Sequence, residues 1–133
     1  MDTLFTKIIK GEIPCYKVAE NDRFFAFLDI NQFAKGHTLV IPKQEGDYIF
    51  DLDEETYIAY LLYARNIAIA IEKAIPCKRI ATAVIGLEVP HTHIHLVPIQ
   101  TENDMNFGQN NKQESAEEMD RIASAIRKEL SCD

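Results

Sequence analysis

The chain of 133 residues is poor in several residue types, and each shortage excludes a class of protein. Its three cysteines, Cys15, Cys77 and Cys132, form neither a disulfide framework nor a C-x-x-C pair, so we expect reduced thiols. No apolar run reaches the roughly 18 residues of a membrane span, and the segment 1–4 lacks the basic region of a signal peptide. We therefore expect a cytoplasmic protein that begins at Met1 and does not bind membranes.

Basic residues are also scarce. The chain has 14 lysines and arginines and 21 acidic residues, which gives a formal net charge of -7. Without a cluster of positive charge, the chain is a poor candidate for binding the phosphate backbone of a nucleic acid. Hydrophobic residues make up 47% of the sequence, which is enough for a buried core. Because no repeat or low-complexity tract divides the chain, residues 1–133 are interpreted as a single domain.

Hydrophobic periodicity predicts three helices and five strands. The helices are expected at 3–10, from the acidic stretch 45–55 to Ile75, and at about 115–130. The strands are expected at 16–19, 24–28, 38–41, 80–85 and 93–99. This order is typical of an α+β domain, and it predicts an antiparallel five-stranded sheet with flanking helices.

The long central helix is apolar over most of its circumference. One predicted buried stripe has alternating spacings of four and three: Tyr57, Leu61, Ala64, Ala68, Ile71 and Ile75. A second stripe lies beside it: Tyr60, Tyr63, Ile67 and Ala70. A helix of this kind needs cover on two sides, and in so short a chain we expect the second cover to be another subunit, which predicts a homodimer.

Three of the four histidines alternate in the short segment His91-Thr92-His93-Ile94-His95. A single histidine on a strand is more often a packing residue, but alternate residues of a strand share one face, with neighbours about 7 Å apart. Three imidazoles on one face suit a catalytic zinc site with an open position. They equally suit nucleophilic catalysis, in which one imidazole attacks and its neighbours move protons. Spacing alone leaves both chemistries open.

The segment His91-Thr92-His93-Ile94-His95-Leu96-Val97 resembles the signature of the histidine triad family. The resemblance extends to the front of the chain, where the run from Thr3 to Pro42 is similar to histidine triad nucleotide-binding proteins. The matching pieces include Glu12-Ile13-Pro14, Ala26-Phe27-Leu28-Asp29-Ile30 and Gly36-His37-Thr38-Leu39-Val40-Ile41-Pro42-Lys43. The resemblance implies a homodimeric α+β fold without a cofactor. It also implies hydrolysis or transfer at the α-phosphorus of a nucleotide, commonly a purine nucleoside phosphoramidate or a dinucleotide.

The resemblance also implies roles for individual residues. His93 would be the nucleophile, with His91 and His95 flanking it to stabilise phosphoryl oxygens and supply a proton, and His37 would complete the proton network. Asp29 would accept hydrogen bonds from the ribose hydroxyls, and Gly86 would let the backbone approach phosphate. The slot for the base would be formed by four apolar residues: Phe5, Ile8, Phe27 and Ile30.

The chain departs from the family pattern at two places. The loop before the triad is shortened, lacks the usual asparagine and carries Glu88, whose carboxylate would repel a phosphate. Some relatives hold a structural zinc ion with a C-x-x-C pair and histidines, but the corresponding residues here are Thr3, Thr6 and Glu45, so we expect no metal. Two alternatives to the covalent enzyme therefore stay open: a nucleotide-binding or scaffold protein that does not catalyse, and a zinc-dependent hydrolase.

Overall fold

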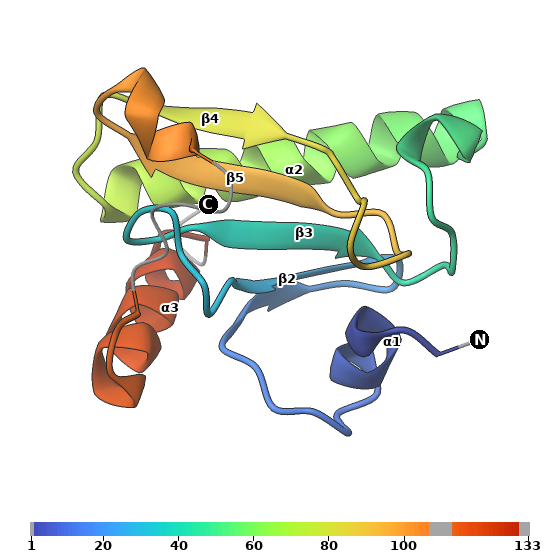
Figure 1. The fold of residues 1–133 in the computed structure, drawn as a ribbon, viewed down its shortest axis with the longest axis horizontal. Coiled ribbons are helices and arrows are strands. Elements are labelled where there is room, and N and C mark those ends of the chain that lie inside the picture. The colour runs from blue at the N-terminus through green and yellow to red at the C-terminus, as the bar shows by residue number, and fades with distance from the viewer. Residues whose placement is uncertain (1, 107–112, 131–133) are drawn as a thin grey trace.

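The computed structural model describes residues 2–106 and 113–130 as one sheet with flanking helices (Figure 1). The strands are β1 (Lys17–Glu20), β2 (Phe24–Leu28), β3 (Thr38–Pro42), β4 (Arg79–Ala83) and β5 (Ile94–Ile99). The helices are α1 (Leu4–Ile9), α2 (Glu54–Ala74) and α3 (Ala116–Leu130), with short 3-10 helices at Ile49–Asp51 and Glu102–Met105. Among these described residues, no helix has the length and apolar character needed to cross a membrane.

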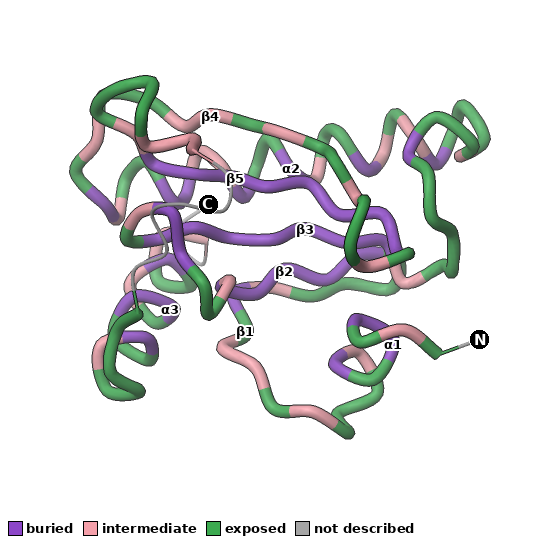
Figure 2. Tube along the Cα trace, viewed as in Figure 1, coloured by how far each residue is buried: buried purple, intermediate pink, exposed green. Residues whose placement is uncertain are grey.

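The five strands form one antiparallel sheet in the order β1-β2-β3-β5-β4, which confirms the predicted fold class. The three inner strands are buried along most of their length, whereas β1 and β4 form the edges and are partly exposed (Figure 2). The predicted bounds differ from the structure by a residue or two, and on the side of the triad β4 ends at Ala83 and β5 begins at Ile94. The exposed side chains of Val84 and Ile85 therefore lie beyond the end of β4.

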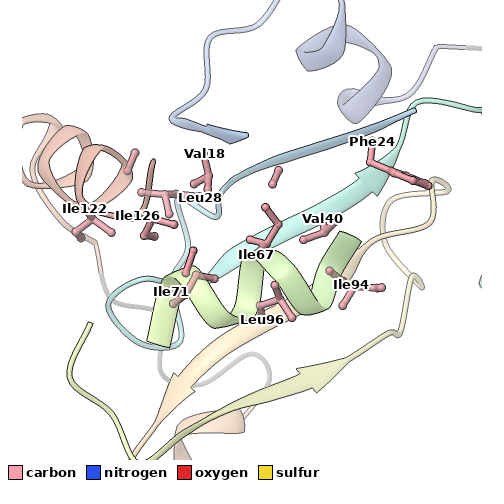
Figure 3. Packing of buried hydrophobic residues seen from close by; sticks show 14 of the residues in the cluster. Val18, Phe24, Leu28, Val40, Ile67, Ile71, Ile94, Leu96, Ile122 and Ile126 are labelled. Carbon is pink, nitrogen blue, oxygen red and sulfur yellow. The ribbon is translucent and has the colours of Figure 1, made fainter. Parts of the chain in front are cut away.

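Successive side chains of each inner strand point to opposite faces of the sheet and enter two separate apolar groups. The first, called the large core here, is covered by α2 and α3 (Figure 3) and contains Val18, Phe24, Ala26, Leu28, Val40, Ile49, Tyr60, Ala64, Ile67, Ala70, Ile71, Ile75, Ile94, Leu96, Met119, Ile122, Ala123 and Ile126. The second, called the small cluster, includes two residues of α1 and contains Phe5, Ile8, Phe25, Phe27, Leu39 and Ile41. We call the face that carries the small cluster the site face.

The buried face of the long helix α2 combines residues from both predicted stripes. Tyr60, Ile67 and Ile71 are almost fully buried in the large core, whereas Leu61 is 40% exposed. The prediction that Leu61 is buried was wrong because apolar residues occur nearly all around this helix, so periodicity alone could not select the inner face. Ile58 and Leu62 are also exposed beside Leu61. The second subunit expected over this surface stays a prediction.

A hydroxyl side chain caps the N-terminus of α1 and of α3. The Thr3 side chain caps α1 by accepting a hydrogen bond from the Thr6 N–H, and the Thr6 hydroxyl oxygen in turn accepts one from the Thr3 N–H. Ser115 accepts from the Glu118 N–H at the start of α3. Four residues of α3 are buried: Met119, Ile122, Ala123 and Ile126.

Candidate active site

The four histidines gather on the site face. His95 lies in β5 opposite Leu39 of β3, and His37 directly precedes β3. His91 and His93 lie in the loop before β5, so the expectation that all three imidazoles share one strand was wrong. The reason is local, because both the N–H and the hydroxyl of Thr92 are bonded to the Gly46 carbonyl instead of a sheet neighbour. The rings still converge, since the centroid of His95 lies 5.1 Å from that of His93 and 5.2 Å from that of His37.

His93 has a single tautomer set by one backbone contact. Its Nδ1 lies 2.8 Å from the His91 carbonyl oxygen, which can only accept, so Nδ1 carries the ring proton. Nε2 therefore keeps its lone pair. Burial lowers the pKa of His93, although the contact with the His91 carbonyl opposes this shift. The ring is thus a neutral imidazole with a nucleophilic nitrogen at neutral pH.

His37 and His95 form a directed hydrogen-bonded pair. The Phe33 N–H donates to Nδ1 of His37 at 3.1 Å, which places the His37 proton on Nε2. That proton is donated across 2.9 Å to Nδ1 of His95, and the His95 proton consequently lies on Nε2. Burial lowers the pKa of His37 to about 3 and that of His95 to about 4, with neighbouring histidines adding to both shifts. The pair is neutral near pH 7 and can relay a proton.

His91 is fully buried and uses both ring nitrogens within the protein. Its Nε2–H donates to the Pro42 carbonyl at 2.8 Å, and its Nδ1 lies 3.3 Å from the Thr3 hydroxyl. Its ring is therefore not placed for the contact with a phosphoryl oxygen that the resemblance implies. Its backbone carbonyl, in contrast, accepts the hydrogen bond that orients His93. The His91 backbone thus orients the His93 ring.

Asp29 follows β2 and lies beside the histidine pair. Its Oδ2 is 3.7 Å from Nε2 of His37, and its Oδ1 accepts from the Asn31 N–H at 2.9 Å. Burial raises the pKa of Asp29, while the bond from Asn31 opposes that shift. A carboxylate with one oxygen fixed by its own loop is suited to accept hydrogen bonds from a ligand.

The structure brings together three of the four residues expected to form the apolar slot. Phe5, Ile8 and Phe27 share the small cluster, and the Phe5 ring lies edge-on to Phe27 at 5.6 Å and to His93 at 5.0 Å. Ile30 is not part of this cluster and is 62% exposed. Any contact of Ile30 with a base therefore has to come from outside the small cluster.

Gly86 lies in the connection between β4 and β5 that leads to the triad. Its φ of +68° is in the left-handed region, where residues with a side chain are strained. A Cβ at this position would lie 3.7 Å from the Asp47 carbonyl oxygen, an ordinary contact, so backbone conformation is what requires glycine. Glu88, two residues further on, is exposed.

One group of described residues has the composition of a metal site. Asp29, His37 and His95 can place one ligand atom each within 4.8 Å of one another. However, His37 Nε2 and His95 Nδ1 face each other at 2.9 Å and share a proton, so neither directs a free lone pair at a common ion. The arrangement fits a proton relay better than a zinc centre.

Sequence reasoning missed three contributors to this geometry: the Thr3 hydroxyl, the Phe33 N–H and the Pro42 carbonyl. Two of them are backbone groups, which carry no signal in the residue type. Thr3 was considered only as the replacement of a metal ligand, and its contact with a residue 88 positions away has no local sequence signal.

The fold and the four converging histidines define a protein of the histidine triad class, and comparisons with known proteins agree. Residues 10–102 match the family model described as HIT domain. The adenosine 5'-monophosphoramidase HNT1 of Saccharomyces cerevisiae is 38% identical over 104 residues, covering 74% of this chain and 63% of the yeast protein. A crystal structure of a Hit-like protein from Bartonella henselae has a TM-score of 0.83 and 32% identity, with 96% of both chains covered.

A third comparison bears on metal binding. The crystal structure of a Zn-bound histidine triad family protein from Mycobacterium smegmatis has a TM-score of 0.81 and 25% identity, covering 99% of this chain and 95% of that one. This chain belongs to the HIT domain family.

Proposed function

We propose that this chain is a nucleotide hydrolase or transferase that acts at the α-phosphorus of a purine nucleoside phosphoramidate or dinucleotide through a covalent nucleotidyl-His93 intermediate. The observation that carries the proposal is the tautomer of His93, whose protonated Nδ1 is held by the His91 carbonyl while Nε2 keeps its lone pair. The similarity to a yeast adenosine 5'-monophosphoramidase supports the choice of a phosphoramidate.

The reaction on a phosphoramidate divides into two displacements. In the first, His93 Nε2 attacks the phosphorus, an N–P bond to the imidazole forms, and the bond from phosphorus to the leaving nitrogen breaks. The leaving nitrogen takes the proton of His95 Nε2, and a proton from solvent replaces it, so that the pair stays neutral. In the second, water attacks phosphorus, the His93 N–P bond breaks, and the proton lost by water returns to solvent through the pair. Two easier steps replace one difficult displacement.

The proposal also assigns binding contacts to residues near the histidines. The Asp29 carboxylate would accept hydrogen bonds from the ribose hydroxyls, and Phe5, Ile8 and Phe27 would supply the apolar wall for the base. Gly86 would allow the backbone of the preceding loop to approach the phosphate.

The test is turnover of adenosine 5′-phosphoramidate by the wild type and by His93→Ala, with intact-mass detection of an adenylylated protein. We expect AMP release and a transient adduct in the wild type, and a loss of at least about a thousandfold in kcat in the variant. AMP binding by both proteins would show that the pocket survives the substitution. Rates like those of the wild type in His93→Ala would contradict the covalent mechanism.

Glu88 favours a second candidate, a nucleotide-binding protein with little turnover, because its carboxylate stands in the loop that leads to the triad. AMP binding by the wild type without turnover or adduct would establish this alternative. Loss of activity to a chelator, with stoichiometric zinc in the active protein, would instead favour the zinc-dependent hydrolase.

A further inference from the structure

The start of α1 packs directly against the loop that carries the triad. The Thr3 hydroxyl oxygen lies 3.3 Å from Nδ1 of His91, which follows it by 88 positions in the chain. Phe5, in the first turn of the same helix, lies edge-on against the rings of His91 and His93, with centroid distances of 5.9 and 5.0 Å. The position of this short helix is therefore coupled to the position of the nucleophile.

The direction of the Thr3–His91 hydrogen bond is fixed by the other partner of the ring. Nε2 of His91 lies 2.8 Å from the Pro42 carbonyl oxygen and must donate, because a carbonyl can only accept. In a neutral imidazole the remaining nitrogen, Nδ1, then has a lone pair. The Thr3 hydroxyl consequently donates its single proton to Nδ1 of His91.

The remaining capacity of the Thr3 hydroxyl is used within the cap of α1. With its proton donated, Thr3 Oγ1 accepts from the Thr6 N–H at 3.2 Å and from the Thr6 hydroxyl at 3.1 Å. Thr6 Oγ1 in turn accepts from the Thr3 N–H at 3.3 Å. A hydroxyl offers one donor and two acceptor sites, and all those of Thr3 are satisfied. The hydroxyl proton of Thr3 thus has one consistent destination, which is His91.

Thr3 and Thr6 do not have the chemistry of zinc ligands. Zinc in proteins is bound by cysteine thiolates, imidazole nitrogens and carboxylate oxygens, whereas Thr3 and Thr6 offer neutral hydroxyls that already bond each other. The connection between Thr3 and His91 is therefore a hydrogen bond.

We propose that Thr3 is a positioning residue, whose hydroxyl donates to His91 Nδ1, keeps that nitrogen unprotonated in accord with the Nε2–H bond to Pro42, and keeps the His91 carbonyl directed at His93 Nδ1. The inference rests on the proposed function for its effect on turnover, but its effect on the His91 tautomer is independent of any activity. Orientation of a catalytic imidazole by a partner of fixed geometry is a general requirement of such sites, because the wrong tautomer is inactive.

Two substitutions separate this role from the capping role of Thr3. Thr3→Ser keeps both the cap and the donor. Thr3→Asp keeps the cap, because aspartate accepts well from the N–H groups at a helix start, but it cannot donate to Nδ1 of His91. Ser115→Ala, which removes the cap hydroxyl of α3 on the opposite face of the sheet, is the matched control for loss of a cap alone.

The first readout is the nitrogen-15 chemical shifts of the His91 ring, and the second is kcat and KM on adenosine 5′-phosphoramidate. We expect Nε2–H only in the wild type and Thr3→Ser, and protonation of both ring nitrogens in Thr3→Asp, where the carboxylate accepts from Nδ1. We expect kcat to fall about tenfold in Thr3→Asp with KM changed less than about twofold, and activity near that of the wild type in Thr3→Ser and Ser115→Ala.

An unchanged His91 tautomer in Thr3→Asp would overturn the inference, as would an equal loss of kcat in Ser115→Ala. If the wild type turns over no phosphoramidate, the proposed function fails, and the ring shifts alone decide whether Thr3 sets the tautomer of His91.

Discussion

The two faces of the sheet bury different kinds of side chain. The face beneath α2 and α3 buries the large core, whereas the site face buries the small cluster together with four histidines. Within β5 the two environments alternate, since Ile94 and Leu96 enter the large core while His95 between them points to the site face. One strand thus contributes both to stability and to the chemistry.

The difference has an energetic consequence. Burial of apolar side chains stabilises a fold, while burial of imidazoles lowers their pKa and makes their protonation costly. On the site face this cost is offset because each neutral histidine ring is hydrogen-bonded to a polar group. We therefore expect substitutions on the first face to change stability, and those on the site face to change activity.

The largest effect on stability is expected in the large core. Ile71 of α2 is fully buried, and Ile71→Ala should lower the free energy of unfolding by about 3–4 kcal/mol through lost transfer energy and a cavity. Urea denaturation measures this change, and kcat below the unfolding transition should stay within about twofold of the wild-type value.

The matched variant on the site face is Leu39→Ala. Leu39 pairs with His95 in the sheet, so its loss should lower kcat. Equal effects of both variants on kcat would remove the distinction between the faces.

Mild acid should destabilise the protein through its site face. The pKa of His37 is about 3 and that of His95 about 4 in the folded chain, against about 6.5 when unfolded, so the unfolded state binds more protons between these values. Stability is therefore fully present above about pH 6.5 and is lost as the pH falls. Each of the two histidines should cost about 2 kcal/mol at pH 5, where the lowered pKa values of the surface carboxylates do not yet contribute.

Urea denaturation at pH 7 and pH 5 measures this loss. His37→Asn, which keeps an acceptor for the Phe33 N–H, should remove the share contributed by His37, about 2 kcal/mol at pH 5. A free energy of unfolding that is equal at the two pH values would contradict the lowered pKa values.

A smaller effect is expected at Gln32, in the connection between β2 and β3. Its side chain is fully buried, and neither amide atom has a hydrogen-bond partner among the described residues. Because unsatisfied buried polar groups are costly, Gln32→Met, which is similar in shape, should raise the free energy of unfolding by about 1 kcal/mol. The measurement is again urea denaturation, with unchanged kcat as the control for the neighbouring Asp29. Destabilisation by Gln32→Met would show that the amide is used.

The sequence predicted the class of fold, the sheet and most helix bounds, because alternation in strands and caps on helices are local signals. It also found all four histidines, since that residue is scarce and three of them alternate. It could not select the inner stripe of α2 or place His91 and His93 outside β5, because a second apolar face and a bond from Thr92 to Gly46 decide these features. The tautomers depend on carbonyl and N–H groups of distant segments, which residue types do not encode.

The smallest predicted effect concerns Glu88 in the loop before the triad. Glu88 is exposed, so its repulsion of a bound phosphate acts through solvent and is screened by salt. We expect Glu88→Ser to raise kcat/KM on adenosine 5′-phosphoramidate about threefold at low ionic strength and less at high salt. Glu117→Ser, an exposed position on α3, is the control for net charge. An equal rise of kcat/KM in both variants would mean that the total charge of the protein, rather than the position of Glu88 in this loop, limits the reaction.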